Sequence, residues 1–127
     1  LVRGNCSLIT GVPGVSDAIR INGIIDRYLE HSRIFIFANG GDEKMFIGSA
    51  DWMPRNLDNR VEVITPVYDS RIKEDLWKVI DFGLRGNCQG SVVDGSGKNC
   101  LWTTDTEESF RSQEELYKYY KSHITND

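Results

Sequence analysis

The stretch HSRIFIFANGGDEKMFIGSAD, residues 31–51, predicts one β-hairpin with polar residues gathered at its open end. Residues 31–37 have the Ile and Phe content of a strand, and NGGD at residues 39–42 is a strong turn signal. Residues 44–49 are then the returning strand, joined to the first by a short glycine-containing loop. We therefore expect residues 48–51, Gly-Ser-Ala-Asp, to lie beside the strand that carries the histidine.

Two helices are predicted on the C-terminal side of this hairpin. Residues 70–85 carry apolar side chains at a spacing close to 3.6, which is typical of a helix with one buried face. Ser112 and Glu115 fit a capping box that opens a final helix ending near residue 122. Between the helices, residues 88–102 read as a second hairpin, interrupted by the turn sequence DGSG.

The remaining segments predict further strands. Residues 16–29 are ambiguous, because Ser16 favours a helix start whereas the β-branched residues and interior glycine favour a strand; we expect a short helical turn and then a strand at 21–25. The other expected elements are strands at 1–10 and at 60–66, the latter ended by proline, and a turn at 11–14. The whole predicts a mixed α/β fold, with α+β as the alternative.

Length and composition indicate a globular domain. The 127 residues suffice for one domain with a core, and 39% hydrophobic with 27% charged residues is ordinary for such a domain. No apolar run approaches the roughly 20 residues that span a bilayer, and no signal-peptide pattern opens the chain. The chain starts at Leu1 within an apolar run, from which we expect a segment of a longer protein, forming one domain over residues 1–127.

Cysteine and charge content narrow the functional classes. Three cysteines without a CxxC pair predict neither a disulfide framework nor a zinc site, and favour reduced thiols in the cytoplasm. A net charge of −4 argues against general nucleic-acid affinity. Six of the seven cations in residues 1–68 are arginine, whereas five of the eight in residues 69–127 are lysine. Since arginine is the better fork for phosphate oxygens, an oxyanion site is favoured in the first part.

The residues at the hairpin's open end point to phosphate chemistry. On an extended strand His31 and Arg33 would share a face, so one ligand could meet an imidazole and a guanidinium together. Glycine at position 48 would let the backbone approach a ligand, and further cations lie at Arg3, Arg55 and Arg60. Singly, each feature has an ordinary explanation: a lone histidine is more often a structural residue than a catalytic one.

The arginines also have an ordinary reading, in which Arg55 and Arg60 are surface charges paired with Asp58 and Glu62. The combined pattern is more specific, because it resembles the second histidine motif of the phospholipase D superfamily, His-x-Lys followed by Gly-Ser-x-Asn. This chain departs from that motif in three ways. Arg33 replaces the lysine, the hairpin between the two parts is longer, and Asp51 replaces the asparagine.

Those departures match one branch of the superfamily. The segments VRG, GVPG, YLEHSRIFIF, SADWMPRNLDNRVEV and FRSQEELYKYY resemble the C-terminal domain of bacterial polyphosphate kinase over nearly the full chain. The resemblance implies a phospholipase D-like domain with a mixed β-sheet flanked by helices. It implies an enzyme that reversibly transfers the terminal phosphate of ATP to inorganic polyphosphate, with Mg²⁺, through a phosphohistidine. Two histidine motifs would face one site, and the phosphorylated histidine would lie upstream of this chain.

The resemblance also implies residue roles. His31 matches the family's second histidine, which binds at the ATP phosphates and assists transfer, and Arg3 matches an arginine that binds the nucleotide phosphates. Arg33, Arg55 and Arg60 lie in family motifs without a defined role; that they line a cationic tunnel for polyphosphate is our hypothesis from their charge. Magnesium ligands would lie upstream, so no metal site is expected here. The full-length enzyme is expected to be a cytoplasmic homo-oligomer that binds ATP, ADP and polyphosphate, with membrane association left open.

Two other functions compete with this one. A phospholipase D-type phosphodiesterase half-site acting on lipid or nucleic acid would use the same histidine, although Arg33 and Asp51 speak against it. A non-catalytic domain that binds phosphate or carries an assembly interface is the alternative from a different class. An assay with ATP and polyphosphate separates the polyphosphate kinase from the phosphodiesterase. Phosphate binding without turnover would favour the non-catalytic domain.

Overall fold

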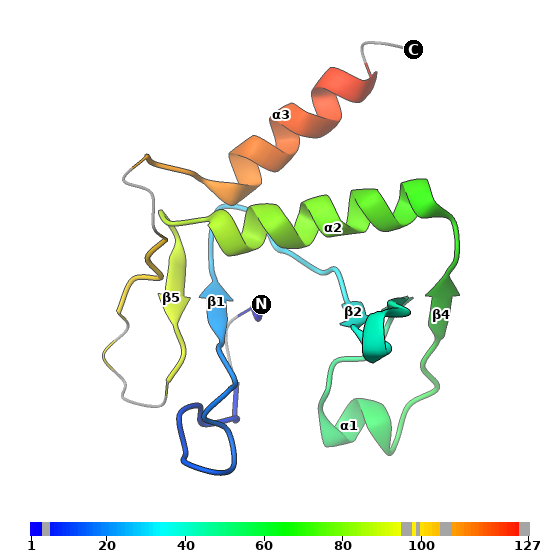
Figure 1. Ribbon diagram of the computed structural model, residues 1–127, viewed down its shortest axis with the longest axis vertical. Helices are drawn as coiled ribbons and strands as arrows, with labels where there is room; N and C mark the ends of the chain where they lie inside the picture. The colour runs from blue at the N-terminus through cyan, green and yellow to red at the C-terminus, as the bar shows by residue number, and fades with distance from the viewer. Residues whose placement is uncertain (4–5, 95–97, 99, 105–107, 125–127) are drawn as a thin grey trace. The chain divides into compact units, whose positions relative to one another are not determined.

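The computed structural model describes residues 1–3, 6–94, 98, 100–104 and 108–124. It has a mixed α/β fold (Figure 1). Its strands form a two-stranded and a three-stranded antiparallel sheet. Its elements are β1 Asn22–Ile24, β2 Ile34–Phe37, a 3-10 turn Asn39–Gly41, β3 Lys44–Gly48, α1 Pro54–Leu57, β4 Ile64–Val67, α2 Ser70–Arg85, β5 Gly90–Val92 and α3 Ser112–Ile124.

The chain divides into two compact units. Unit 1 comprises Leu1–Leu29 and Lys78–Asp127, and unit 2 comprises Glu30–Trp77. The β1–β5 sheet and α3 belong to unit 1, whereas the β2–β3–β4 sheet and α1 belong to unit 2. This division into compact units does not test the expectation of a single domain over residues 1–127, which stays a prediction.

The hairpin predicted at residues 31–51 is the centre of unit 2. Strands β2 and β3 pair antiparallel with Ile34 opposite Ile47, and β3 pairs with β4 with Met45 opposite Val67. The loop between β2 and β3 has positive φ at Asn39 (45°) and at both following glycines (65° and 101°). Glycine tolerates this conformation without the steric cost that a Cβ imposes, which explains why the NGG sequence turns the chain here.

Unit 2 buries one face of its sheet more fully than the other. Met45 is 1% exposed and its cross-strand partner Val67 is 8% exposed, so the buried side of the sheet is built around this pair. On the alternate positions Phe35 stacks on Trp52, with ring centroids 5.7 Å apart and planes 15° apart. Trp52 itself is largely exposed.

Unit 1 is organised around β1, which pairs antiparallel with β5 through Asn22 opposite Val92. Ile24 of β1 is buried, and the Asn22 side chain, 2% exposed, donates from Nδ2 to the carbonyl of Gly83 in α2 at 3.3 Å. The Oδ1 atom of Asn22 lies against Gly90 of β5, where an added Cβ would stand 2.7 Å from it. The same Cβ would be 2.9 Å from Cβ of Trp102, so the position accepts only glycine without movement.

We expect Gly90→Ala to lower the free energy of unfolding by about 1–3 kcal/mol, because the methyl group has no space between Asn22 and Trp102. Urea denaturation followed by circular dichroism measures the change. Val15→Ala, at a side chain that is 77% exposed, is the control and should stay within about 0.5 kcal/mol of the wild type. Equal stability of Gly90→Ala and the wild type would show that this strand pair is looser than described.

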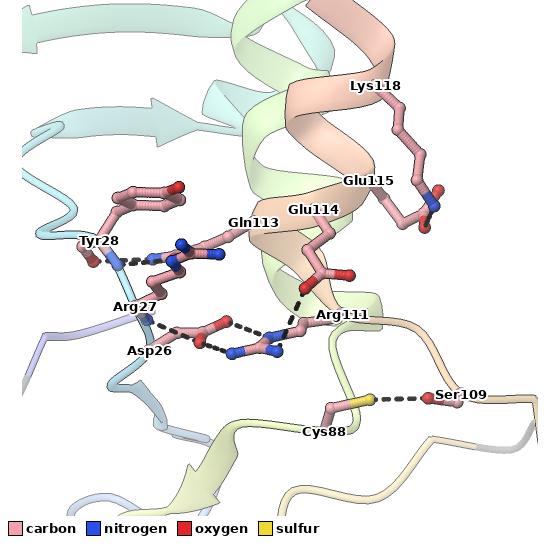
Figure 2. Close-up of polar contacts among 10 residues, drawn as sticks. All are labelled: Asp26, Arg27, Tyr28, Cys88, Ser109, Arg111, Gln113, Glu114, Glu115 and Lys118. Atoms are coloured by element: carbon pink, nitrogen blue, oxygen red, sulfur yellow. Dashed lines mark hydrogen bonds and ion pairs between the residues drawn. The ribbon is translucent and has the colours of Figure 1, made fainter.

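The start of α3 is held to the segment that follows β1 (Figure 2). Arg111 donates from Nη2 and Nε to the two carboxylate oxygens of Asp26, at 2.6 and 3.1 Å, and the Asp26 side chain is 1% exposed. The hydrogen bond from Arg111 is the main reason that the pKa of Asp26 is lowered. Next to this pair, the Gln113 amide accepts from the Tyr28 N–H at 2.9 Å and donates to the Tyr28 carbonyl at 2.8 Å. These four contacts anchor residues 26–28 within unit 1.

Both long helices confirm the sequence prediction. Helix α2 has the predicted bounds, and α3 begins at the predicted residue and ends at Ile124. Phe82 of α2 meets Phe110 and Tyr119 edge-on, with centroids 5.5 and 5.8 Å apart, and so packs α3 within unit 1. The predicted capping box differs in the structure. Ser112 is the first residue of the helix and not the residue before it, and the Glu115 carboxylate accepts from Lys118 Nζ at 2.6 Å.

Several strand predictions were wrong in their bounds. In residues 1–3 and 6–10, the described part of the strand predicted at 1–10, the structure has a single bridge, between Val2 and Gly23. Farther on, Ser16 Oγ donates to the Ile9 carbonyl in a loop. The strand predicted at 60–66 starts at Ile64 and continues through Pro66. Proline is tolerated there because β4 is an edge strand, whose outer N–H groups need no partner strand.

The remaining strand predictions are confirmed in outline. The strand expected at residues 21–25 is β1, and the one expected at 44–49 is β3. The hairpin expected at residues 88–102 appears as β5 with a bridge from Ser91 to Leu101; most of its DGSG turn lies outside the described residues. The strand expected at residues 31–37 is shorter, because β2 begins only at Ile34.

Candidate functional site

His31 and Arg33 are brought together by the arginine side chain and not by a shared strand face. Both residues precede β2, so the strand argument for their alignment was wrong. Arg33 reaches back: its Nη1 lies 2.8 Å from His31 Nδ1 and donates to the His31 carbonyl at 3.0 Å. One guanidinium nitrogen therefore contacts both the ring and the backbone of an exposed histidine.

Asp51 completes this contact from the other side of the hairpin. Its Oδ1 accepts from Arg33 Nε at 3.0 Å and from Nη2 at 2.8 Å. The backbone holds the register, since Gly48 N–H donates to the Arg33 carbonyl at 3.1 Å. This confirms the prediction that residues 48–51 lie beside the histidine segment. His31, Arg33 and Asp51 form a continuous cluster, which we call the His31 cluster.

The electrostatics of the His31 cluster follow from these contacts. The hydrogen bond from Arg33 is the main cause that lowers the pKa of the Asp51 carboxyl, and the charges of Arg33 and Arg55 act in the same direction. A carboxyl with a pKa lowered by folding stabilises the fold above its unfolded pKa. That contribution is lost as the pH falls through the folded value. Asp51 is therefore ionised at neutral pH and balances the charge of Arg33.

A second polar network supports the Gly-Ser turn. Ser49 Oγ donates to a Glu62 carboxylate oxygen and accepts from the Val63 N–H at 3.0 Å. Asn56, 2% exposed, donates from Nδ2 to Glu62 Oε1 at 2.8 Å. These hydrogen bonds lower the pKa of Glu62, and the one from Ser49 has the larger effect. They tie α1 to the turn that carries Asp51.

Among the described residues, Arg55 and Arg60 do not form the ion pairs considered with Asp58 and Glu62, and their role stays a prediction. Both residues are exposed, and within the part of the chain that the structure describes neither forms an ion pair or a hydrogen bond through its guanidinium. Glu62, the partner considered for Arg60, is bound to Ser49 and Asn56 instead. Two cations of unit 2 are thus left facing solvent.

Arg3 is the one predicted site residue that belongs to unit 1. It is exposed and follows Val2, which donates to the Asn22 carbonyl at 2.9 Å and accepts from the Ile24 N–H at 2.8 Å. The backbone beside Arg3 is therefore attached to β1. The nucleotide-binding role expected for Arg3 stays a prediction.

Among the described residues, no three or more His, Cys, Asp or Glu side chains gather where a metal ion could be held. No helix in residues 6–94 or 108–124 is long and apolar enough to cross a membrane. The thiols of Cys6, Cys88 and Cys100 are free.

Sequence reasoning missed two participants in the site. Asp51 was noted as a departure from the expected asparagine, but its ion pair with Arg33 was not foreseen; opposite charges at the two departures were the available signal. Glu62 was considered only as a partner for Arg60. The hydrogen bonds that Glu62 accepts from Ser49 and Asn56 had no local sequence signal, because these partners lie 13 and 6 residues away.

A mixed α/β fold with antiparallel sheets, in which a histidine–x–arginine segment is held against a Gly-Ser-x-Asp turn, is of the phospholipase D-like class. The family model for polyphosphate kinase C-terminal domain 2 matches residues 1–113. The chain therefore belongs to the polyphosphate kinase C-terminal domain family. This confirms the resemblance seen in the sequence.

Individual relatives agree with the family match. The chain is 44% identical over 122 residues to the polyphosphate kinase of Escherichia coli K12, covering 96% of this chain and 18% of that protein. It is 43% identical to the Salmonella typhimurium polyphosphate kinase, again over 122 residues that cover 96% of this chain and 18% of that protein. The crystal structure of polyphosphate kinase from Porphyromonas gingivalis matches with a TM-score of 0.88 and 39% identity, over 98% of this chain and 19% of that one. The chain thus spans about a fifth of the length of these relatives.

Proposed function

We propose that this chain forms one wall of the active site of a polyphosphate kinase, which moves the terminal phosphate of ATP onto inorganic polyphosphate and back. Family membership supports the reaction class. The observation that carries the proposal is the His31 cluster, in which a guanidinium held by Asp51 contacts an exposed imidazole at 2.8 Å. Phosphoryl transfer depends mainly on positioning and on donors around the moving charge, and this cluster supplies both.

In this proposal His31 assists the transfer and does not carry the phosphate. A histidine nucleophile in the rest of the protein attacks the terminal phosphorus of ATP, forming an N–P bond as ADP leaves; the terminal oxygen of polyphosphate then takes the phosphoryl group. Such a reaction needs a group near the leaving oxygen that can donate a hydrogen bond or a proton. His31 has that chemistry and is exposed.

Magnesium is expected with ATP but is assigned no ligand in this chain. The described residues offer no group of three or more metal-ligating side chains. Its ligands are expected in the rest of the protein. Cytoplasmic location and homo-oligomeric assembly of the whole enzyme likewise stay predictions.

Arg55 and Arg60 are proposed to contact the polyphosphate chain. Both are exposed, and their guanidinium groups are not engaged by other described residues, so their charge is available to an anion. Asp51 and Glu62 are committed to other partners and so do not neutralise them by direct pairing. An anionic polymer on such a surface should bind more weakly as the salt concentration rises.

Arg3→Ala in the full-length enzyme is expected to weaken the use of ATP more than Arg3→Lys does. Loss of a charge-assisted hydrogen bond to phosphate costs roughly 1.5–3 kcal/mol, or about 10- to 100-fold in kcat/KM for ATP. Lysine keeps the charge but not the bidentate fork. Steady-state kinetics with varied ATP measure the effect, and Arg20→Ala, another exposed arginine of unit 1, is the control. Unchanged ATP kinetics in Arg3→Ala would remove Arg3 from the site.

The proposed function is tested by offering the full-length protein two kinds of substrate. Transfer from ATP to polyphosphate, measured against hydrolysis of a chromogenic phosphodiester, separates a polyphosphate kinase from a phospholipase D-type phosphodiesterase. We expect the first activity and not the second. Phosphate binding without turnover of either substrate would contradict the proposal and favour a non-catalytic binding domain.

A further inference from the structure

The two residue exchanges that separate this chain from the general phospholipase D motif contact each other. The motif has lysine and asparagine where this chain has Arg33 and Asp51. In sequence they are unrelated, since 18 positions separate them. In the structure they form an ion pair at 2.8 Å, in which the Arg33 side chain is 18% exposed and that of Asp51 39%. Two separate departures from the motif are therefore one physical interaction.

The shape of the guanidinium explains why the exchanges belong together. Arg33 presents Nε and Nη2 to Asp51 and keeps Nη1 for His31. A guanidinium is planar and rigid, so fixing its Nε–Nη2 edge also fixes the direction of Nη1. Because the group only donates hydrogen bonds, His31 Nδ1 accepts in this contact, which leaves Nε2 as the nitrogen available to a ligand. A lysine ammonium cannot hold a carboxylate and orient an imidazole through one rigid plane.

We propose that Arg33 and Asp51 act as one coupled pair, in which Asp51 is a positioning residue that sets the orientation of His31 through the Arg33 guanidinium. The inference rests on the proposed function for its catalytic meaning. In an enzyme with asparagine at position 51, the arginine would lose its charged anchor, and its Nη1 would no longer be directed at the histidine. In an enzyme with lysine at position 33, Oδ1 of Asp51 would lose the paired Nε and Nη2 donors. Each exchange is thus expected to be harmful alone.

A double-mutant cycle in the full-length enzyme tests the pair. Asp51→Asn is expected to lower kcat for transfer from ATP to polyphosphate by about 10- to 100-fold, because His31 is misplaced, with KM for ATP changed by less than about threefold. Arg33→Lys should have a comparable effect. The double variant Arg33→Lys with Asp51→Asn removes the pair from both sides, and we expect its kcat to be no lower than that of Asp51→Asn alone, because one coupled interaction is lost only once. Asp51→Glu, which keeps the charge, should retain part of the activity.

Matched controls and an independent readout make the result decisive. Asp58→Asn removes an exposed aspartate at the end of α1 and should leave kcat unchanged. Reaction of His31 with diethyl pyrocarbonate, followed by peptide mass spectrometry, reports the ring without requiring turnover; we expect faster modification in Asp51→Asn and Arg33→Lys than in the wild type and Asp58→Asn. Multiplicative effects of the two single exchanges in the double variant, or unchanged His31 modification, would overturn the coupled pair. Absence of polyphosphate synthesis in the wild type would instead contradict the proposed function. The rates of His31 modification would still test whether Arg33 and Asp51 are coupled.

Discussion

His31→Ala in the full-length enzyme is expected to reduce polyphosphate synthesis by about 10²- to 10⁴-fold, the usual range for loss of an acid–base or donor group. The reason is that His31 is the exposed imidazole of the His31 cluster, held by Arg33 at 2.8 Å. Transfer of radiolabelled phosphate from ATP to acid-insoluble polymer measures the effect. His123→Ala removes the other histidine of the chain, which is exposed on α3, and should be neutral.

The same experiment distinguishes assistance from covalent catalysis. If His31 only assists, the 127-residue chain incubated with Mg²⁺ and ATP should acquire no acid-labile phosphate by intact mass. It should bind phosphate or nucleotide weakly, since it carries only part of the cationic site. A stable phosphohistidine at His31 would overturn this division of roles, and so would full activity of the His31→Ala enzyme.

Met45→Ala is expected to give the largest loss of stability in unit 2. The Met45 side chain is 1% exposed and is paired across the sheet with Val67, so truncation leaves a cavity between β3 and β4. Removing a buried methionine side chain of this kind typically costs about 2–5 kcal/mol. Chemical denaturation of the full-length protein, followed by a probe in unit 2 such as Trp52 fluorescence, measures the change.

The second methionine of the chain provides the control for this substitution. Met53 is 37% exposed and precedes α1 without a side-chain cap, so Met53→Ala should cost much less than Met45→Ala. Similar losses in the two variants would contradict the described core. A large loss in Met53→Ala alone would indicate that this side chain is covered in the full-length protein.

Local sequence patterns determined much of the fold. The 3.6-residue periodicity of residues 70–85 corresponds to α2, and NGG at residues 39–41 corresponds to the turn with three positive φ angles. Both depend on interactions between residues a few positions apart, so the sequence contains their cause. The same holds for the family: its motifs around residues 28–37 and 49–63 are short contiguous strings, and the comparisons confirmed family membership.

The tertiary structure alone decided which polar groups meet. Arg33 donates hydrogen bonds to Asp51, 18 residues away. Glu62 accepts hydrogen bonds from Ser49 and Asn56 and not from the neighbouring Arg60. In the described part of residues 1–10, where a strand was expected, the tertiary structure leaves one bridge, from Val2, because a strand forms only where another backbone offers a ladder of partners. A hydrogen bond requires its atoms within about 3 Å, and the hairpin register, not the order of residues, brings them to that distance. The sequence by itself therefore determined the two long helices, the hairpin turn and the family, whereas the folded chain determined that Arg33 contacts both Asp51 and His31.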